Sequence, residues 1–144
     1  MQNSVCRVFG DNVQYKWDVD GEDKTVIPDA SINCRFRSRR GNSFFNNPRF
    51  VMEVLSPSTE KYDRGEKMEL YRIQEIDEYW IVDWRKKQVE IYVLDYEQDE
   101  PKYYLFCTVT CENKKELKMV HFPNIKITFD ELFNGIDYEA ENEE

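Results

Sequence analysis

The segment from residue 50 to residue 83 constrains the fold of this chain more than any other. It begins with an apolar run through Glu53 to Leu55, breaks at Ser56-Pro57-Ser58, continues with a helical pattern and ends with a second apolar run at residues 78–83. This order predicts a strand, a turn, an amphipathic helix and a second buried strand. Glu53 then lies near the end of an inner strand, where a carboxylate is costly unless a metal ion, a proton or a cation compensates it.

Length and composition favour one sheet-rich domain. The chain has 144 residues, which suits a single core, and 15% of them are aromatic. The apolar runs rich in β-branched and aromatic residues outnumber the helical patterns. We therefore expect an α+β fold with a mixed, mostly antiparallel sheet and one main helix, formed by residues 1–136 and followed by an acidic tail at residues 137–144.

No apolar segment approaches the ~20 residues that cross a bilayer, and the first ten residues lack the basic and apolar layout of a signal peptide. The sequence thus predicts a cytoplasmic protein without a membrane partner. Four cysteines (Cys6, Cys34, Cys107 and Cys111) show no paired C-x-x-C spacing, which gives zinc binding little support. In the cytosol we expect these cysteines to be reduced structural thiols.

Turn signals and alternating patterns locate the other elements. The pair Gly10-Asp11 predicts a hairpin between residues 4–9 and 12–18, and a third strand over residues 25–34 contains Pro28-Asp29. A mobile loop over residues 35–48 then leads to the Glu53 strand. Asp63 is expected to cap the main helix, as the first residue of an acid-x-x-Glu capping box.

The last part of the chain gives two further signals. Residues 102–109 and 117–120 predict a second hairpin. A short helix is predicted to begin at Thr128, whose hydroxyl can accept an amide hydrogen bond, and to stop at Gly135.

The formal net charge of −9 argues at first against nucleic acid, because affinity for phosphate comes mainly from lysine and arginine. The charge is unevenly distributed, however. Five acids fall in the last eight residues, and four arginines crowd one loop: Arg35, Arg37, Arg39 and Arg40. The loop is either an ordinary solvated segment or a clamp that binds DNA phosphates through bidentate guanidinium groups.

Asp29 and Glu53 form the candidate catalytic pair. Carboxylates at the ends of neighbouring strands can share Mg²⁺ or Mn²⁺, and the main-chain carbonyl of Val54 can supply a third oxygen. A metal ion held in this way activates a water molecule for attack on a phosphodiester bond. Lys67 would hold the water or the phosphate. The alternative is that Glu53 is an ordinary surface acid at the end of its strand, without a catalytic role.

Several of these residues occur together in a known pattern. The ordered set comprises Pro28-Asp29, Glu53-Val54-Leu55-Ser56-Pro57-Ser58, Asp63, Gly65, Lys67, Tyr71 and Glu78-Tyr79-Trp80-Ile81-Val82-Asp83. It resembles the Uma-type family of restriction-endonuclease-like proteins, which are similar in fold to the PD-(D/E)XK nucleases. The resemblance covers residues 5–133. It implies a restriction-endonuclease-like core and Mg²⁺-dependent hydrolysis of phosphodiester bonds in DNA.

The resemblance also implies roles for individual residues. Asp29 and Glu53 match the two metal-binding acids of the family. The superfamily lysine is expected two residues after the glutamate, where this chain has Leu55; Lys67 of the helix matches the lysine that Uma-type members share. Asp63, Tyr71 and Asp83 are candidates for residues that support the site. The alternatives are that Asp63 is a helix cap, Tyr71 a core aromatic residue and Asp83 an acid in a turn.

One departure favours a second function. Uma-type proteins resemble one another in an additional N-terminal region, and this chain begins after it, which implies a truncated, partner-completed or inactive member. The alternative function is therefore a catalytically inactive domain that acts as an interaction or oligomerisation module, as a homodimer or a larger oligomer. RNA binding through arginines and aromatic residues is a weaker third option, since no RNA-binding module is recognisable.

Overall fold

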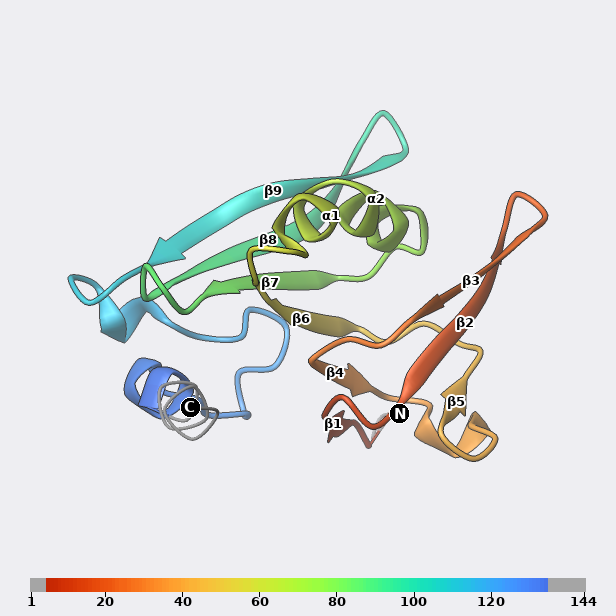
Figure 1. Ribbon diagram of the computed structural model, residues 1–144, viewed down its shortest axis with the longest axis horizontal. Coiled ribbons are helices and arrows are strands. Elements are labelled where there is room, and N and C mark those ends of the chain that lie inside the picture. Colours follow the sequence, from red (N-terminus) through yellow and green to blue (C-terminus); the bar gives the residue numbers. More distant parts are fainter. Residues whose placement is uncertain (1–4, 135–144) are drawn as a thin grey trace.

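The computed structural model describes residues 5–134 and contains two β-sheets (Figure 1). The larger sheet has the strand order β1-β4-β6-β7-β8-β9. Its strands are β1 (Arg7–Phe9), β4 (Ala30–Asn33), β6 (Phe50–Val54), β7 (Glu78–Asp83), β8 (Gln88–Glu97) and β9 (Glu100–Val109). Only β6 and β7 are parallel within this sheet, so the predicted mixed, mostly antiparallel sheet is confirmed.

The smaller sheet has three strands in the order β3-β2-β5, namely β3 (Glu22–Val26), β2 (Gln14–Val19) and β5 (Ser43–Phe44). Strands β2 and β3 form a hairpin whose turn residues Asp20 and Gly21 both have positive φ angles, of 52° and 83°. Two consecutive positive φ angles are typical of the tight turns whose twist matches that of the flanking strands.

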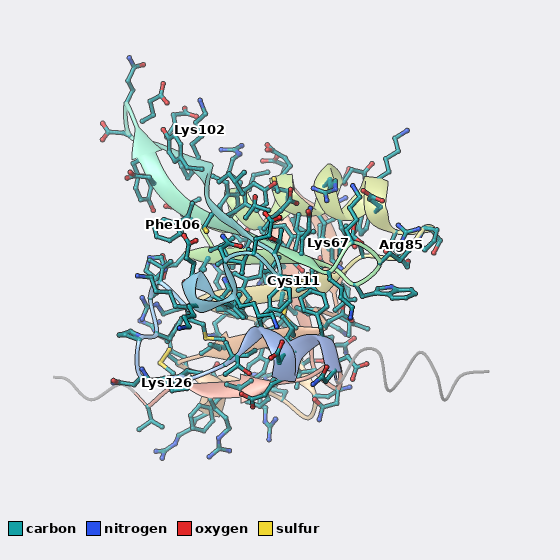
Figure 2. The ribbon with its side chains drawn as sticks, turned by 90° about the vertical axis from the view of Figure 1, so that its left-hand side faces the viewer. Lys67, Arg85, Lys102, Phe106, Cys111 and Lys126 are labelled. Carbon is teal, nitrogen blue, oxygen red and sulfur yellow. A yellow bond between two sulfur atoms is a disulfide. The ribbon has the colours of Figure 1, made fainter. Side chains whose placement is uncertain are left out.

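Helices α1 (Glu60–Arg64) and α2 (Glu66–Ile73) connect the parallel strands β6 and β7 and cover one face of the larger sheet (Figures 1 and 2). Parallel neighbours require such a crossover. The predicted start of the helix at Asp63 is wrong, because Thr59 is the N-cap of α1 and Asp63 lies inside that helix. Gly65 separates the two helices with φ −110° and ψ −95°, which are not helical angles.

Both faces of the larger sheet are buried at its central strand, β7. All six residues of β7 are buried, as expected for the inner strand of the predicted unit. On one face, Tyr79 and Ile81 pack with residues of α2 and the smaller sheet. On the other face, Trp80 and Val82 pack with the segment at residues 117–133. The Glu53 strand therefore runs through the middle of the protein.

Both predicted hairpins are wrong in their pairing. β1 pairs with β4 instead of β2, because the chain crosses from the larger to the smaller sheet after Gly10. β9 pairs with β8 across a turn at Gln98 and Asp99, both of which have positive φ angles. Residues 117–120 form no strand; their alternation reflects an extended segment that buries Leu117 and Met119 against the sheet.

The segment predicted as a loop, residues 35–48, contains the 3₁₀ helix η1 (Phe36–Ser38) and β5. A second 3₁₀ helix, η2 (Lys114–Glu116), follows β9. The cap at Thr128 is confirmed: its hydroxyl accepts a hydrogen bond from the amide of Glu131 at 3.1 Å, and a helix begins at Phe129. Gly135 and the acidic tail at residues 137–144 lie outside the described residues. No helix within residues 5–134 is long and apolar enough to cross a membrane.

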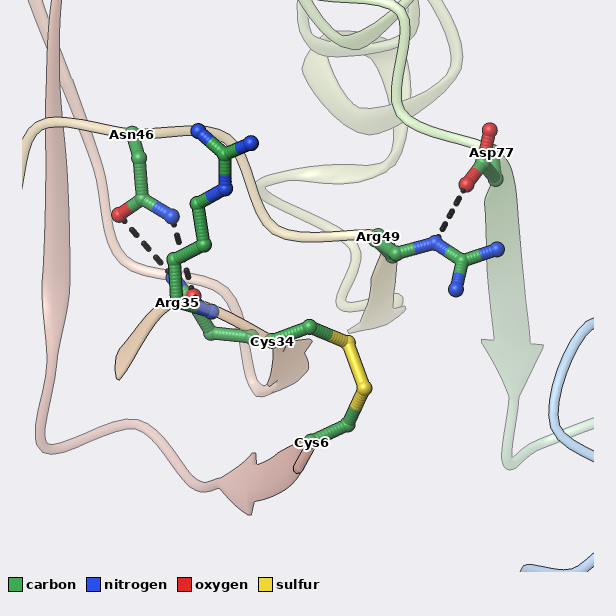
Figure 3. Close-up of a disulfide and its surroundings, with 7 residues drawn as sticks. Cys6, Cys34, Arg35, Asn46, Arg49 and Asp77 are labelled. Carbon is green, nitrogen blue, oxygen red and sulfur yellow. Dashed lines mark hydrogen bonds and ion pairs between the residues drawn. A yellow bond between two sulfur atoms is a disulfide. The ribbon is translucent and has the colours of Figure 1, made fainter. Parts of the chain in front are cut away.

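The prediction of four reduced thiols is wrong for Cys6 and Cys34, which form a disulfide (Figure 3). The pairing of Arg7 with Asn33 explains it, because the antiparallel register of β1 and β4 puts the next residues of both strands opposite each other. Their Cα atoms are 3.9 Å apart. Cys107 and Cys111 are free.

Candidate active site

Glu53 is a buried carboxylate in contact with the helix layer. Val51, Glu53 and Leu55 are alternate residues, so their side chains lie on the same face of the sheet, and this face packs under the helices. Only 3% of the residue is exposed. Its Oε2 atom accepts a hydrogen bond from the hydroxyl of Tyr71 at 2.6 Å and forms an ion pair with Nζ of Lys67 at 2.8 Å.

Helix α2 positions both of these partners. Lys67 and Tyr71 are four residues apart and therefore lie on one face of the helix, as their spacing predicted. Lys67 lies between α2 and the strands (Figure 2). The ring of Tyr71 is fully buried and packs edge-on against Trp17 and Tyr79, with ring centroids 6.3 and 5.1 Å apart. The aromatic packing fixes the hydroxyl of Tyr71 on Glu53.

Asp29 reaches the same end of β6 from the neighbouring strand. It directly precedes β4, which pairs with β6 so that Ala30 lies opposite Met52. Its Oδ2 atom accepts a hydrogen bond from the backbone amide of Val54 at 2.7 Å. In an extended strand the N–H and C=O groups of one residue point toward the same neighbour. The carbonyl of Val54 therefore points toward the side of β6 where the Asp29 carboxylate lies.

Asp63 supplies a third carboxylate from α1. Asp63 is 3% exposed, and its Oδ1 atom lies 3.9 Å from Nζ of Lys67. The hydroxyl of Tyr79 donates a hydrogen bond to the main-chain carbonyl of Asp63 at 2.9 Å. Thus a buried tyrosine of β7 holds the end of α1 against the sheet beside Lys67.

The acids at this site hold their protons more tightly than exposed carboxylates do. Burial raises the pKa of Glu53 to about 7, and the negative charge of Asp29 adds to this, while Lys67 and Tyr71 oppose it. Burial also raises the pKa of Asp63, against the effect of Lys67. The pKa of Tyr71 lies well above its ordinary value, because the ring is buried and faces the Glu53 carboxylate. One lysine does not fully compensate the acids around it.

The residues present fit a hard divalent cation. The carboxylates of Asp29 and Glu53 and the carbonyl of Val54 are oxygen ligands, which Mg²⁺ and Mn²⁺ prefer, and Mg²⁺ usually keeps several waters in addition. No group of three or more histidine, cysteine, aspartate or glutamate side chains within residues 5–134 is arranged to hold a metal ion. A cation here would therefore rely on two carboxylates, main-chain oxygen and water.

Two sets of predicted residues lie away from this point. The Oδ1 atom of Asp83 accepts hydrogen bonds from the amides of Arg85 and Lys86, at 3.1 and 3.2 Å, so this acid stabilises the turn after β7. The arginine loop (Arg35, Arg37, Arg39 and Arg40) follows the far end of β4, whereas Asp29 precedes its start. Five residues, 30–34, lie between Asp29 and Arg35, which corresponds to about 20 Å of extended chain.

The arginines are exposed and partly ordered by aromatic rings. The guanidinium of Arg37 lies 5.9 Å from the ring centroid of Phe36, and that of Arg39 lies 5.5 Å from the centroid of Phe9. Arg7 of β1 also lies over Phe36, at 4.3 Å. Sequence reasoning did not include Arg7 in the basic set, because its contact depends on the unpredicted pairing of β1 with β4.

Glu78 is a second buried acid whose role the sequence did not reveal. Its carboxylate accepts hydrogen bonds from Nε1 of Trp80 at 2.7 Å and from the amides of Val120 and His121 at 3.0 Å each. Nδ1 of His121 lies 2.9 Å from it. Glu78 thus binds the segment at residues 117–133 to the start of β7. The only signal was an acid at the beginning of an inner strand.

Comparisons with known proteins place the chain in a family. The model of the Uma2 family, described as "Putative restriction endonuclease", matches residues 1–117. An uncharacterized protein of Synechocystis sp. is 30% identical over 114 residues, which cover 78% of this chain. They cover 56% of that relative, so the chain spans little more than half of its length.

A solved structure resembles the fold. It is the crystal structure of "a putative nuclease belonging to DUF820 from Anabaena variabilis", with a TM-score of 0.62 and 18% sequence identity. The match covers 91% of this chain and 69% of that chain. This likeness shows a common fold.

Proposed function

The chain belongs to the Uma2 family, and we propose that it is a nuclease that hydrolyses phosphodiester bonds in DNA with the help of Mg²⁺ or Mn²⁺. Its restriction-endonuclease-like fold, which the sequence resemblance implied, is confirmed. One observation carries the proposal: Asp29 before β4, Glu53 of β6 and Lys67 of α2 converge at the carboxyl end of β6.

Asp29, Glu53 and the carbonyl of Val54 would hold the cation. When bound, such an ion lowers the pKa of a bound water and offsets negative charge on the phosphoryl group. Tyr71 keeps the Glu53 carboxylate in place through its hydrogen bond to Oε2. The raised pKa of Glu53, about 7, means that protons compete with a cation for this carboxylate at neutral pH.

Lys67 supplies the positive side chain. An ammonium group has three N–H donors, and the ion pair with Glu53 uses one of them. The others are available to a phosphate oxygen or a water molecule. Leu55, which occupies the position expected for the superfamily lysine, is buried in the core under the helices. We infer that the amine of Lys67 in α2 takes the role that a lysine at position 55 would have.

The arginine loop is the proposed DNA-binding element. Its guanidinium groups are exposed, and stacking on phenylalanine leaves their N–H groups available for phosphate oxygens. Since β4 and Cys34 separate this loop from Asp29 by about 20 Å of extended chain, DNA would have to extend along the strand to contact both. At about 3.4 Å per nucleotide, that distance corresponds to roughly six nucleotides.

Nicking of supercoiled plasmid tests the proposal. The unaltered chain should nick DNA with Mg²⁺ or Mn²⁺ but not with EDTA. Asp29→Asn, Glu53→Gln and Lys67→Met should each lose at least 100-fold of the rate, in line with the typical cost of removing one charge-stabilising group. Glu97→Gln, which replaces an exposed acid of β8, should keep full activity. Cleavage that survives all three site substitutions would refute the assignment.

The edge strand β9 favours a second candidate function, an interaction or oligomerisation module. Within the described part of the chain β9 pairs only with β8, and Tyr104, Leu105 and Phe106 near its middle are 42%, 52% and 52% exposed. An apolar edge strand is a surface for pairing with another chain. Sedimentation of the unaltered protein and of Leu105→Lys tests this function; a monomer in both cases would exclude self-association through β9.

A further inference from the structure

We propose that Asp63 is a positioning residue that receives the ammonium group of Lys67 when a divalent cation binds Glu53. The inference rests on the proposed function and assigns the partner of Lys67 during cation binding. Lys67 contacts both acids unequally: its Nζ atom lies 2.8 Å from Oε2 of Glu53 and 3.9 Å from Oδ1 of Asp63.

A cation on Glu53 would compete with Lys67 for one carboxylate. Both the ammonium group and a divalent ion are positive, and at this buried position little water screens their repulsion. Oε2 also accepts the hydrogen bond from Tyr71, so Glu53 keeps a neutral donor when Lys67 leaves. Tyr71 then still holds one oxygen of the Glu53 carboxylate, and the negative charge of this carboxylate is free to interact with the cation.

Asp63 is placed to accept the displaced group. It is 3% exposed, and within residues 5–134 it is the second of the two carboxylates in ion-pair contact with Lys67. The buried side chain of Lys67 therefore finds a new partner through a movement of about an ångström. An ammonium group left without a partner at this depth would be costly.

The backbone that carries Asp63 is fixed from three sides. Tyr79 donates a hydrogen bond to its carbonyl at 2.9 Å, and the amide of Asp63 donates to the carbonyl of Thr59 at 2.8 Å. The next residue, Arg64, forms a 2.6 Å ion pair with Glu90 of β8. The acid is thus stationary, and the flexible lysine side chain is the group that moves.

Calorimetric titration with Mn²⁺, in the absence of DNA, tests the inference as a double-mutant cycle. The four proteins are the unaltered chain, Asp63→Asn, Lys67→Gln and the double variant, each checked for folding by circular dichroism. Asp63→Asn should weaken Mn²⁺ binding about 10-fold, because Lys67 then stays on Glu53 and competes with the ion. With Lys67→Gln already present, the same substitution should change the affinity by less than about twofold.

Equal losses in both backgrounds would overturn the inference, since Asp63 would then act on the cation directly. No loss in either background would overturn it too. If the unaltered chain binds no Mn²⁺, the metal-dependent function fails together with the inference, whereas Mn²⁺ binding without coupling refutes the inference alone.

A crystal structure of the unaltered chain with Mn²⁺ gives a second test that does not depend on the folding of a variant. Lys67 Nζ should then lie within hydrogen-bonding distance of Asp63, about 2.7–3.2 Å, and beyond it from Glu53. A cation on Glu53 with Lys67 still on Oε2 would contradict the proposal.

Discussion

Ionisation of Glu53 should make the protein less stable as the pH rises, when EDTA keeps the site free of metal ions. The pKa of this carboxyl is about 7 in the folded protein, against an ordinary value of 4.5. Below pH 4.5 the group is protonated in both the folded and the unfolded state. Between pH 4.5 and 7 the unfolded chain releases the proton first, so stability is lost as pH rises.

The size of this effect follows from the two pKa values. Each tenfold difference in proton affinity corresponds to 1.36 kcal/mol, so the folded protein should lose about 3 kcal/mol of unfolding free energy from this group between pH 4 and pH 8. The cause is chiefly the burial of the carboxylate, which the ion pair with Lys67 offsets in part. The charge of Asp29 increases the loss.

Urea denaturation at pH 4.5, 6, 7 and 8 measures this loss. Other acids titrate over the same range, so Glu53→Gln is measured in parallel and the difference between the two pH profiles is compared. The unaltered protein should lose about 3 kcal/mol more than the variant over this range. Parallel profiles would refute the argument, because they would show that Glu53 ionises as easily in the folded protein as in the unfolded chain.

Three further substitutions test other parts of the structure. Tyr71→Phe removes a buried hydrogen bond to a carboxylate and should lower the urea-derived unfolding free energy by about 1.5–3 kcal/mol. Reduction of the Cys6–Cys34 disulfide, whose cysteines are 28 residues apart, should lower the unfolding free energy by about 3–4 kcal/mol. Cys34→Ser should lower it by the same amount without reductant. Glu78→Ala leaves several buried donors without an acceptor and should cost about 3 kcal/mol or more in the same denaturation assay.

The sequence predicted the inner part of the fold because local signals and burial agree there. The apolar runs of β6 and β7 and the helical spacing of Lys67 and Tyr71 are local features, and the parallel pair needs a crossover. The contact of Lys67 with Glu53 follows from them. The helix start was missed because Thr59, a weaker signal than the capping box at Asp63, is the N-cap of α1.

The outer part of the fold depends on pairings that no local signal specifies. β1 has three residues, and it could pair with β2 as well as with β4 by pattern alone. The disulfide between Cys6 and Cys34 and the contact of Arg7 with Phe36 both follow from the pairing that occurs. The position of the arginine loop, at the far end of β4 from Asp29, likewise required the structure.

Two buried glutamates show why Glu53 is the better candidate for a metal ligand. Glu78 accepts donors on both carboxylate oxygens, from Trp80, Val120 and His121, and so its partners are complete without an ion. Glu53 accepts both of its donors on one oxygen, Oε2.

The charges lead to the same distinction. Asp29, Glu53 and Asp63 bring three carboxylates to a site with one ammonium group, that of Lys67. Burial raises the pKa of Glu53 and of Asp63, and the negative charge of Asp29 adds to it in both cases. A site with three ionised acids and one lysine has a formal charge of −2, which one divalent cation neutralises. A carboxylate kept only for stability would instead be expected to have complete partners, as Glu78 does.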